Sequence, residues 1–255
     1  MFRENAIVLA KRPLNKDHYL LTLKAPRTAS EGRPGQFAEL DTKRATLLRK
    51  PISIANLDAE KGEVTFVFRT VGKGTKALSE LEAGQDLDLI GPLGNGFTPT
   101  GKPALLIGGG VGTPPMWFLA SRLKDRVETK VVLGARSAED LILKEEFAAL
   151  GLEPIAATDD GSLGVKGTVI DAILGSGLPL GETEAYACGP LPMLKALAEL
   201  AEKRGFSLQV SLEAYMGCGV GVCVGCVVPT ASGMLRVCKE GPVFNSKEII
   251  WSKIR

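Results

Sequence analysis

The chain of 255 residues contains a single histidine, His18. Zinc proteases of the His-Glu-x-x-His type and Rieske iron–sulfur centres each need two histidines, so both classes are excluded. The string Gly-x-Ser-x-Gly is absent as well, which argues against a Ser-His-Asp hydrolase. His18 lies in a polar Asp-His-Tyr stretch, where we expect a solvated turn residue.

An excess of charge of one sign is also lacking, since 31 Lys and Arg residues face 29 Asp and Glu residues. The net charge of +2 leaves no electrostatic footprint for nucleic acid or for an anionic membrane. The uncharged stretch from Pro103 to Ala120 is interrupted by three consecutive glycines and a Pro-Pro pair, which excludes a membrane span there. With no secretory leader visible, we expect a soluble, cytoplasmic protein.

Four of the five cysteines lie in one C-terminal stretch, spaced Cys218-x4-Cys223-x2-Cys226-x11-Cys238. Three thiolates on a tight loop and a fourth from a following hairpin are what a plant-type [2Fe-2S] cluster requires. The glycines between them let the backbone wrap a cluster closely and point N–H groups at its sulfurs. Zinc sites with four cysteines commonly use two Cys-x2-Cys knuckles, and this stretch has one. A zinc-stapled, non-enzymatic binding module therefore stays as the alternative.

Three segments differ in their hydrophobic pattern. Up to about Pro99, short β-type runs alternate with turns, which predicts a small closed antiparallel barrel with strands over 7–9, 19–23, 37–40, 52–54, 64–68 and 87–90. After Gly101, strands alternate with amphipathic segments, which predicts a doubly wound parallel sheet with strands over 104–107, 130–133, 153–157, 184–187 and 207–211. The clearest helix is 191–204. The tail is too short to bury a core of its own, so it needs a metal or a covering partner. We place the domains at 1–99, 100–212 and 213–255.

Two short motifs in the parallel-sheet segment suit a dinucleotide. The string GGGVGTPP, Gly108 to Pro115, follows a predicted strand and opens a helix, where N–H groups and the helix dipole favour a pyrophosphate. Pro115 replaces the third glycine of the usual fingerprint, so a plain strand-to-helix turn is the alternative. Cys188, in the run ACGP, follows the fourth strand at the sheet edge where ligands bind, unless it is a buried bystander thiol.

Two further glycine-containing strings are candidate phosphate-binding motifs. The run GKGT at 72–75 is a glycine turn that ends in a hydroxyl residue and suits a phosphate. A near-match to the nucleotide-binding P-loop at Gly96 to Pro103 is rejected, because Pro103 replaces the hydroxyl residue that binds magnesium.

Taken in order, RKPIS at 49–53, GGGVGTPP and ACGP resemble the ferredoxin–NADP reductase superfamily over nearly the whole chain. The tail SLEAYMGCGVGVCVGCVV with VCKEGPVF is similar to the electron-transfer subunits of dihydroorotate dehydrogenase B. This resemblance implies FAD in the barrel, NAD on the parallel sheet and the [2Fe-2S] cluster on the tail. A reductase or diaphorase subunit of another flavin and [2Fe-2S] complex is the alternative, although dioxygenase reductases carry a complete ferredoxin domain instead of a short tail.

The resemblance also implies site residues. For FAD they are Lys50, Pro51, Ile52, Ser53, Val67, Phe68, Arg69, Gly74 and Thr75; for NAD they are Gly109, Gly110, Gly112, Thr113, Pro115, Cys188, Gly189 and Pro190. Lys50 stands where an arginine is usual and neutralises a pyrophosphate as a point charge, with Arg49 beside it. We expect Ser53 beside the reactive flavin nitrogen and Cys188 nearest the nicotinamide, neither acting as acid or base. NAD is implied over NADP, although Arg136 and Ser137 are placed to meet a 2′-phosphate.

The implied partner is an FMN-containing dihydroorotate dehydrogenase catalytic subunit in a heterotetramer. The partner would oxidise dihydroorotate in pyrimidine biosynthesis, and electrons would pass through the cluster and FAD to NAD+. No catalytic proton shuttle is visible in this chain, which agrees with substrate chemistry on another subunit. We expect the apolar residues around the cysteines to form the partner surface; they are Val220, Val222, Val224, Val227 and Val228.

Overall fold

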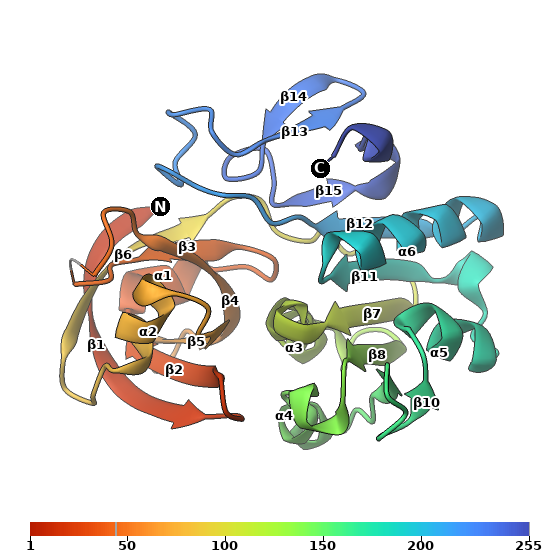
Figure 1. Cartoon of the computed structure of the whole chain (residues 1–255), viewed down its shortest axis with the longest axis horizontal. Coiled ribbons are helices and arrows are strands. Elements are labelled where there is room, and N and C mark those ends of the chain that lie inside the picture. Colours follow the sequence, from red (N-terminus) through yellow and green to blue (C-terminus); the bar gives the residue numbers. More distant parts are fainter. Residues whose placement is uncertain (44, 255) are drawn as a thin grey trace.

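The computed structural model describes residues 1–43 and 45–254. Its first part is a closed antiparallel barrel with strand order β1-β2-β5-β4-β3-β6, which confirms the predicted barrel (Figure 1). The strands are β1 (Phe2–Pro13), β2 (His18–Lys24), β3 (Phe37–Leu40), β4 (Lys50–Asp58), β5 (Glu63–Arg69) and β6 (Asp86–Leu93), with short helices α1 (Pro26–Glu31) and α2 (Lys73–Ser79). Alternate residues of each strand fill the barrel, as Ala6 and Val8 do on β1.

The second part is a mainly parallel sheet with strand order β10-β9-β8-β7-β11-β12-β15. Its strands are β7 (Ala104–Gly109), β8 (Thr129–Ala135), β9 (Ile155–Thr158), β10 (Val165–Lys166), β11 (Glu184–Cys188), β12 (Ser207–Ser211) and β15 (Val243–Asn245). Leu105 and Ile107 of β7 face the core that α5 (Val169–Gly175) and α6 (Leu191–Arg204) cover. Leu106 faces the opposite core, under α3 (Thr113–Leu123) and α4 (Lys144–Ala149). The predicted doubly wound sheet is thereby confirmed.

Helix α3 joins the two parts, because it lies between the barrel and the sheet (Figure 1). Met116 and Leu119 pack into the core of the sheet, whereas Phe118 belongs to the core of the barrel. The barrel therefore sits beside the strand-to-helix turn that starts α3. No helix in the described part is long and apolar enough to cross a membrane.

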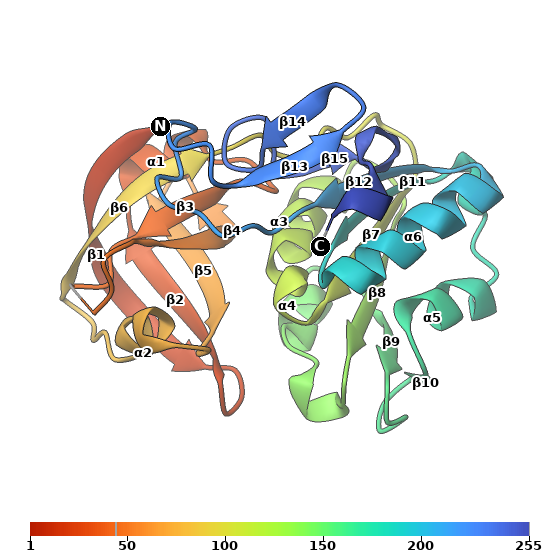
Figure 2. The same cartoon turned by 45° about the horizontal axis from the view of Figure 1, so that its top comes forward.

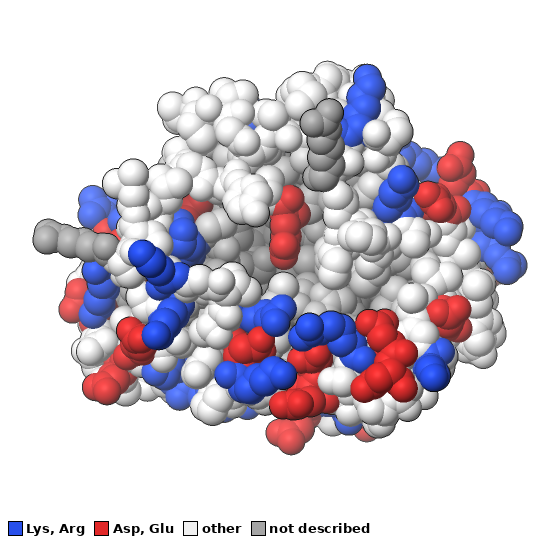
Figure 3. Space-filling view, in the orientation of Figure 1, with Lys and Arg blue, Asp and Glu red and all other residues white. Residues whose placement is uncertain are grey.

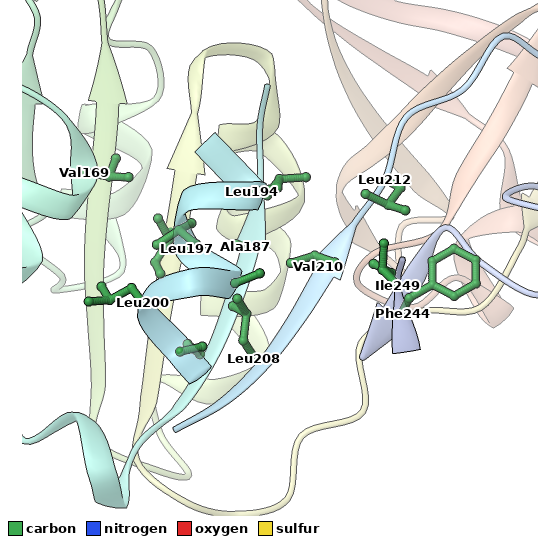
Figure 4. Close-up of a cluster of buried hydrophobic side chains, with 14 of the residues drawn as sticks. Val169, Ala187, Leu194, Leu197, Leu200, Leu208, Val210, Leu212, Phe244 and Ile249 are labelled. Atoms are coloured by element: carbon green, nitrogen blue, oxygen red, sulfur yellow. The ribbon is translucent and has the colours of Figure 1, made fainter. Parts of the chain in front are cut away.

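The tail crosses the top of both parts (Figures 1 and 2). It forms a hairpin of β13 (Val227–Thr230) and β14 (Gly233–Arg236) and then adds β15 antiparallel to β12. Phe244 and Ile249 pack beside Leu212 and Val210 at the edge of the sheet (Figure 4). The tail thus compensates for its short length in part by sharing the core of the sheet.

Candidate functional site

A cavity of about 500 Å³ lies where the barrel faces the carboxyl ends of the parallel strands. Gly109, Gly110 and Gly189 line it from the sheet, and His18 and Arg69 line it from the barrel. Figure 3 shows this face hollowed between the two parts, with acidic atoms at the centre of the hollow. Open parallel sheets bind their ligands at this edge, so the cavity is the candidate dinucleotide site.

Gly112 explains how two of the predicted motifs meet. It ends a short 3-10 turn (Gly110–Gly112) directly before α3, and a Cβ at this position would collide with the carbonyl group of Cys188 and lie 2.5 Å from the nitrogen of Gly189. Only glycine lets the turn approach the end of β11 this closely. Thr113 and Pro115 form the first turn of α3 immediately behind it. The structure therefore brings GGGVGTPP and ACGP together at one edge of the cavity.

Cys188 ends β11 and is only 2% exposed. Burial, with a smaller contribution from the charge of Glu213, raises the pKa of its thiol to about 12. The thiol is therefore neutral near pH 7 and does not exchange a proton there. Its neighbours Gly189 and Pro190 line the cavity. That Cys188 lies nearest the nicotinamide stays a prediction.

Glu213 is a residue of this site that the sequence analysis missed. It follows β12 and borders both the dinucleotide cavity and a second cavity of about 820 Å³ beneath the tail. Although its side chain is open to the cavity, desolvation by the surrounding protein raises its pKa. The signal was available, because a residue that follows a parallel strand at its carboxyl end falls at the ligand edge.

The predicted FAD residues of β4 and α2 lie side by side. Lys50, Pro51, Ile52 and Ser53 begin β4, and Gly74 and Thr75 lie in the first turn of α2. The side chain of Lys50 runs along Gly74, where a Cβ would lie 3.1 Å from Cγ and Cδ of the lysine. The Thr75 hydroxyl accepts the N–H of Val71 (2.9 Å) and caps this turn. A cation and a helix N-terminus thus meet, which suits a pyrophosphate.

The three residues at the end of β5 that were predicted to contact FAD point in three different directions. The Phe68 side chain points into the barrel and stacks on Tyr19, with ring centroids 6.0 Å apart, so only its backbone can face a cofactor. Val67 packs toward α3. Arg69 reaches the cavity, where its Nε donates to Asp17 Oδ2 at 2.7 Å.

The expectation that His18 is a solvated turn residue is wrong. His18 begins β2 and is 4% exposed, with Nδ1 2.8 Å from Asp17 Oδ1 and 2.9 Å from Asn15 Oδ1. The Asn15 side chain also accepts the N–H groups of Asp17 and His18, which folds the turn back under the ring. Burial lowers the pKa of His18, so the ring is neutral at pH 7.

The cysteines of the tail lie as two pairs. Cys218 Sγ accepts the N–H groups of Val222 (3.3 Å) and Cys223 (3.4 Å), and Cys226 Sγ accepts the N–H of Cys238 (3.4 Å). Desolvation opposes ionisation of Cys218, but these backbone hydrogen bonds outweigh it and lower its pKa to about 6. This thiol is therefore largely the thiolate, the form that binds metal.

Within residues 1–43 and 45–254, no three or more His, Cys, Asp or Glu side chains are grouped closely enough to hold a metal ion. The donor chemistry nevertheless fits an iron–sulfur cluster. Four thiols lie on one tail, and a glycine loop with Gly219 and Gly221 in the left-handed region aims the N–H groups of Val222 and Cys223 at the sulfur of Cys218.

Strand β3 connects the tail to the predicted flavin strand. Phe37 pairs with Ser53 in the register of β3 and β4, and Phe37 belongs to the same buried core as Cys226 and Cys238. Ala38 instead belongs to the barrel interior, so Phe37 and Ser53 share the outer face of the barrel that the tail covers. One strand of the barrel therefore separates Ser53 from the core that holds two of the thiols.

Comparison with known proteins agrees with this arrangement. The iron–sulfur cluster binding domain of dihydroorotate dehydrogenase B matches residues 213–250, an oxidoreductase NAD-binding domain matches residues 106–199, and an oxidoreductase FAD-binding domain matches residues 5–97. The chain therefore binds FAD, NAD and an iron–sulfur cluster, and the alternative of a zinc-stapled module is set aside.

Among solved structures, that of an NADH-dependent reduced ferredoxin–NADP oxidoreductase has a TM-score of 0.87 at 31% identity, covering 98% of this chain and 91% of that one. The ferredoxin reductase of carbazole 1,9a-dioxygenase has a TM-score of 0.68 at 26% identity, covering 80% and 66%. The fold is thus shared with flavin-dependent reductases.

Relatives with nearly the same length are more specific. The dihydroorotate dehydrogenase B (NAD(+)) electron transfer subunit of Geobacillus thermodenitrificans is 42% identical, covering 97% of this chain and 98% of its own. That of Bacillus cereus strain G9842 is 39% identical, covering 98% and 99%. The words electron transfer subunit imply a separate catalytic subunit as partner. The chain belongs to the family of dihydroorotate dehydrogenase B (NAD+) electron transfer subunits.

Proposed function

We propose that this chain passes electrons from an FMN-containing dihydroorotate dehydrogenase subunit to NAD+, within a cytoplasmic heterotetramer of pyrimidine biosynthesis. The observation that carries the proposal is the place of β3, between the tail core with Cys226 and Cys238 and the strand with Ser53. When bound, the cluster carries single electrons, FAD exchanges one-electron for two-electron transfer, and NAD+ accepts a hydride. We assign FAD to residues 1–99, NAD to 100–212 and the cluster to 213–255.

On the flavin side, the residues of this chain bind FAD and orient it. Lys50 and the first turn of α2 neutralise the FAD pyrophosphate, and Arg49 supports this strand by donating to Asp88 Oδ2 at 2.6 Å. Ser53 lies on the outer face of β4, and we assign it to the reactive part of the flavin. The segment Val67, Phe68 and Arg69 contacts FAD through its backbone at Phe68, because that side chain fills the barrel.

On the nicotinamide side, the backbone of Gly109 and Gly110 binds the NAD pyrophosphate ahead of Thr113, while Gly189 and Pro190 form the floor under the nicotinamide. The neutral Cys188 thiol beneath them keeps water out and moves no proton. Glu213 also lines this cavity with its carboxyl group.

The preference for NAD over NADP has support at the far end of the cavity. Arg136 reaches Asp140 with Nη2 to Oδ2 at 3.0 Å, and Asp159 also lines the cavity. A 2′-phosphate would meet a guanidinium already engaged by one carboxylate, with a second carboxylate nearby. We therefore assign NAD as the cofactor, with Arg136 paired to Asp140.

The partner surface lies on the tail. Val222 and Val224 are 79% and 57% exposed. Two other apolar residues of the tail are exposed as well, Tyr215 at 99% and Met234 at 60%. Figure 3 shows this upper face largely white, with a Lys or Arg at its right-hand side. Val220 and Val227 are half-buried and Val228 is buried, so only part of the valine set is available to a partner. An apolar surface around the thiols suits a subunit that delivers electrons there.

The test is reconstitution. The purified chain should bind FAD and iron and reduce a dye with NADH, and should turn over dihydroorotate with NAD+ only when the FMN-containing subunit is added. Dye reduction without dihydroorotate turnover in the presence of that subunit would contradict the partner assignment.

A second candidate rests on the TM-score of 0.87 to the NADH-dependent reduced ferredoxin–NADP oxidoreductase. In that case the chain would serve a complex that reduces ferredoxin or NADP+. Ferredoxin-dependent turnover in place of dihydroorotate turnover would favour it.

A further inference from the structure

Glu39 is a buried carboxyl group that the proposed electron path does not use. It lies on β3 with 2% exposure, and its Oε1 has no hydrogen-bond partner among the residues that the structure describes. A buried polar atom without a partner costs about 1–3 kcal/mol. Such an atom points to a group that binds beside it.

The position of Glu39 is between the flavin strand and the cluster loop. It pairs with Pro51 of β4 and, like Phe37 two residues earlier, faces outward from the barrel. The loop packs directly on its carboxyl group, because a Cβ at Gly219 would lie 2.5 Å from both Cγ and Oε1 of Glu39. Gly219 has φ +66° and follows Cys218 in the chain. The carboxyl group therefore touches the loop next to a cluster ligand.

The charges around Glu39 leave it without an ion-pair partner. Arg49 is engaged by Asp88 at 2.6 Å, and Lys50 extends along Gly74 toward the turn of α2. Desolvation raises the pKa of Glu39 to about 7, against the opposing effects of Arg49 and Lys50 and with support from Cys218. A carboxyl group in so dry a place takes up a proton more readily than an exposed one, and its protonated form has an O–H to donate.

We propose that Glu39 is a positioning residue for the cluster, which donates a hydrogen bond to a sulfur on the Cys218 side and fixes the loop at Gly219 against β3. This proposal depends on one part of the proposed function, namely that the tail holds a redox-active cluster beside β3. A donor to sulfur stabilises the more negative, reduced cluster, so its loss lowers the reduction potential. Partners of this kind typically contribute about 10–100-fold to metal affinity or activity.

The test compares Glu39→Gln, which keeps a donor of the same shape, with Glu39→Leu, which has none. In purified holoprotein, the potentials of cluster and flavin are measured at one pH by redox titration with EPR and absorption, together with iron retention under a chelator. We expect a lower cluster potential and about tenfold weaker iron retention in Glu39→Leu, near wild-type values in Glu39→Gln, and an unchanged flavin potential. Glu60→Leu, on an exposed turn of the barrel, is the matched control.

Three results would overturn the proposal. A higher cluster potential in both variants would show that the side chain acts as a negative charge. Equal potentials in all variants would show that it only fills space, and a shift confined to the flavin would assign it to FAD. Should Glu39→Leu fail to fold, Gly219→Ala is the second variant. Its methyl group pushes the loop away from the carboxyl group of Glu39 and must therefore lower the cluster potential. A wild-type protein that holds no cluster would instead refute the proposed function.

Discussion

Replacing Gly112 by alanine tests the dinucleotide site most sharply. Its φ of −81° suits any residue, so the substitution adds one methyl group without backbone strain. That Cβ would lie 2.5 Å from the nitrogen of Gly189, whereas ordinary contacts begin at 3.4 Å. The glycine turn must therefore retreat from β11 by about 1 Å. A misplacement of this size costs about 100-fold in rate, or about 2.7 kcal/mol of transition-state stabilisation.

The assay is NADH-dependent dye reduction by the purified flavoprotein, with FAD and iron content measured in the same samples. We expect kcat/KM for NADH to fall about 100-fold while FAD and iron stay bound, because the atoms nearest to the added methyl group belong to Cys188 and Gly189. Gly175→Ala is the matched control, since a Cβ at the end of α5 meets nothing within 4 Å. An unchanged kcat/KM in Gly112→Ala would refute the claim that this turn and β11 jointly bind the nicotinamide dinucleotide.

Three further predictions concern the flavin strand, strand β11 and the tail. Lys50→Ala should purify with little FAD and Lys50→Arg with a full complement, measured by absorption after denaturation, because the cation beside Gly74 neutralises the pyrophosphate. Burial opposes ionisation of Glu184, but hydrogen bonds from Thr100, Tyr186 and Gln209 outweigh it and lower its pKa. The ionised Glu184 therefore stabilises the fold above its usual pKa of 4.5, and this stabilisation is lost as the pH falls through its lower pKa in the folded protein. Glu184→Gln should lower Tm at pH 7, and thermal melts should show a weaker decrease of Tm at acid pH than in the wild type. Val222→Asp should weaken binding to the catalytic subunit in size-exclusion chromatography but leave NADH dye reduction intact, because this 79% exposed side chain lies away from the cavity.

Local patterns were sufficient to predict the barrel and the parallel part of the sheet. The period of hydrophobic residues gave helix 191–204 with its stop at Gly205, which takes φ +74° as a left-handed C-cap. Strand rhythm gave the barrel, where alternate residues such as Ala6 and Val8 fill one core, and the sheet, where neighbouring residues such as Leu105 and Leu106 face two different cores. What the pattern could not predict is that the tail returns as β15 to the edge of the sheet, because a short run such as Val243–Asn245 carries no information about its pairing partner.

Site residues could be predicted only where they form a motif with a characteristic spacing in the sequence. The cysteines and glycine strings satisfied that condition, but His18 did not, because the Asn15 turn that buries it is a tertiary feature hidden in a polar stretch. Glu39 and Glu213 are single charged residues beside apolar ones, and their meaning appears only when register places them against Gly219 and the cavity. Phe68 shows the same limit, since one step in strand register decides between barrel interior and cofactor.

The most direct measurement is an anaerobic titration of the purified chain with NADH, followed by visible absorption and EPR. The account predicts about two iron atoms and one flavin per chain, and reduction of both centres by NADH through the cavity and β3. A flavin that is reduced while the cluster stays oxidised, in a chain loaded with both, would contradict the claim that β3 connects them.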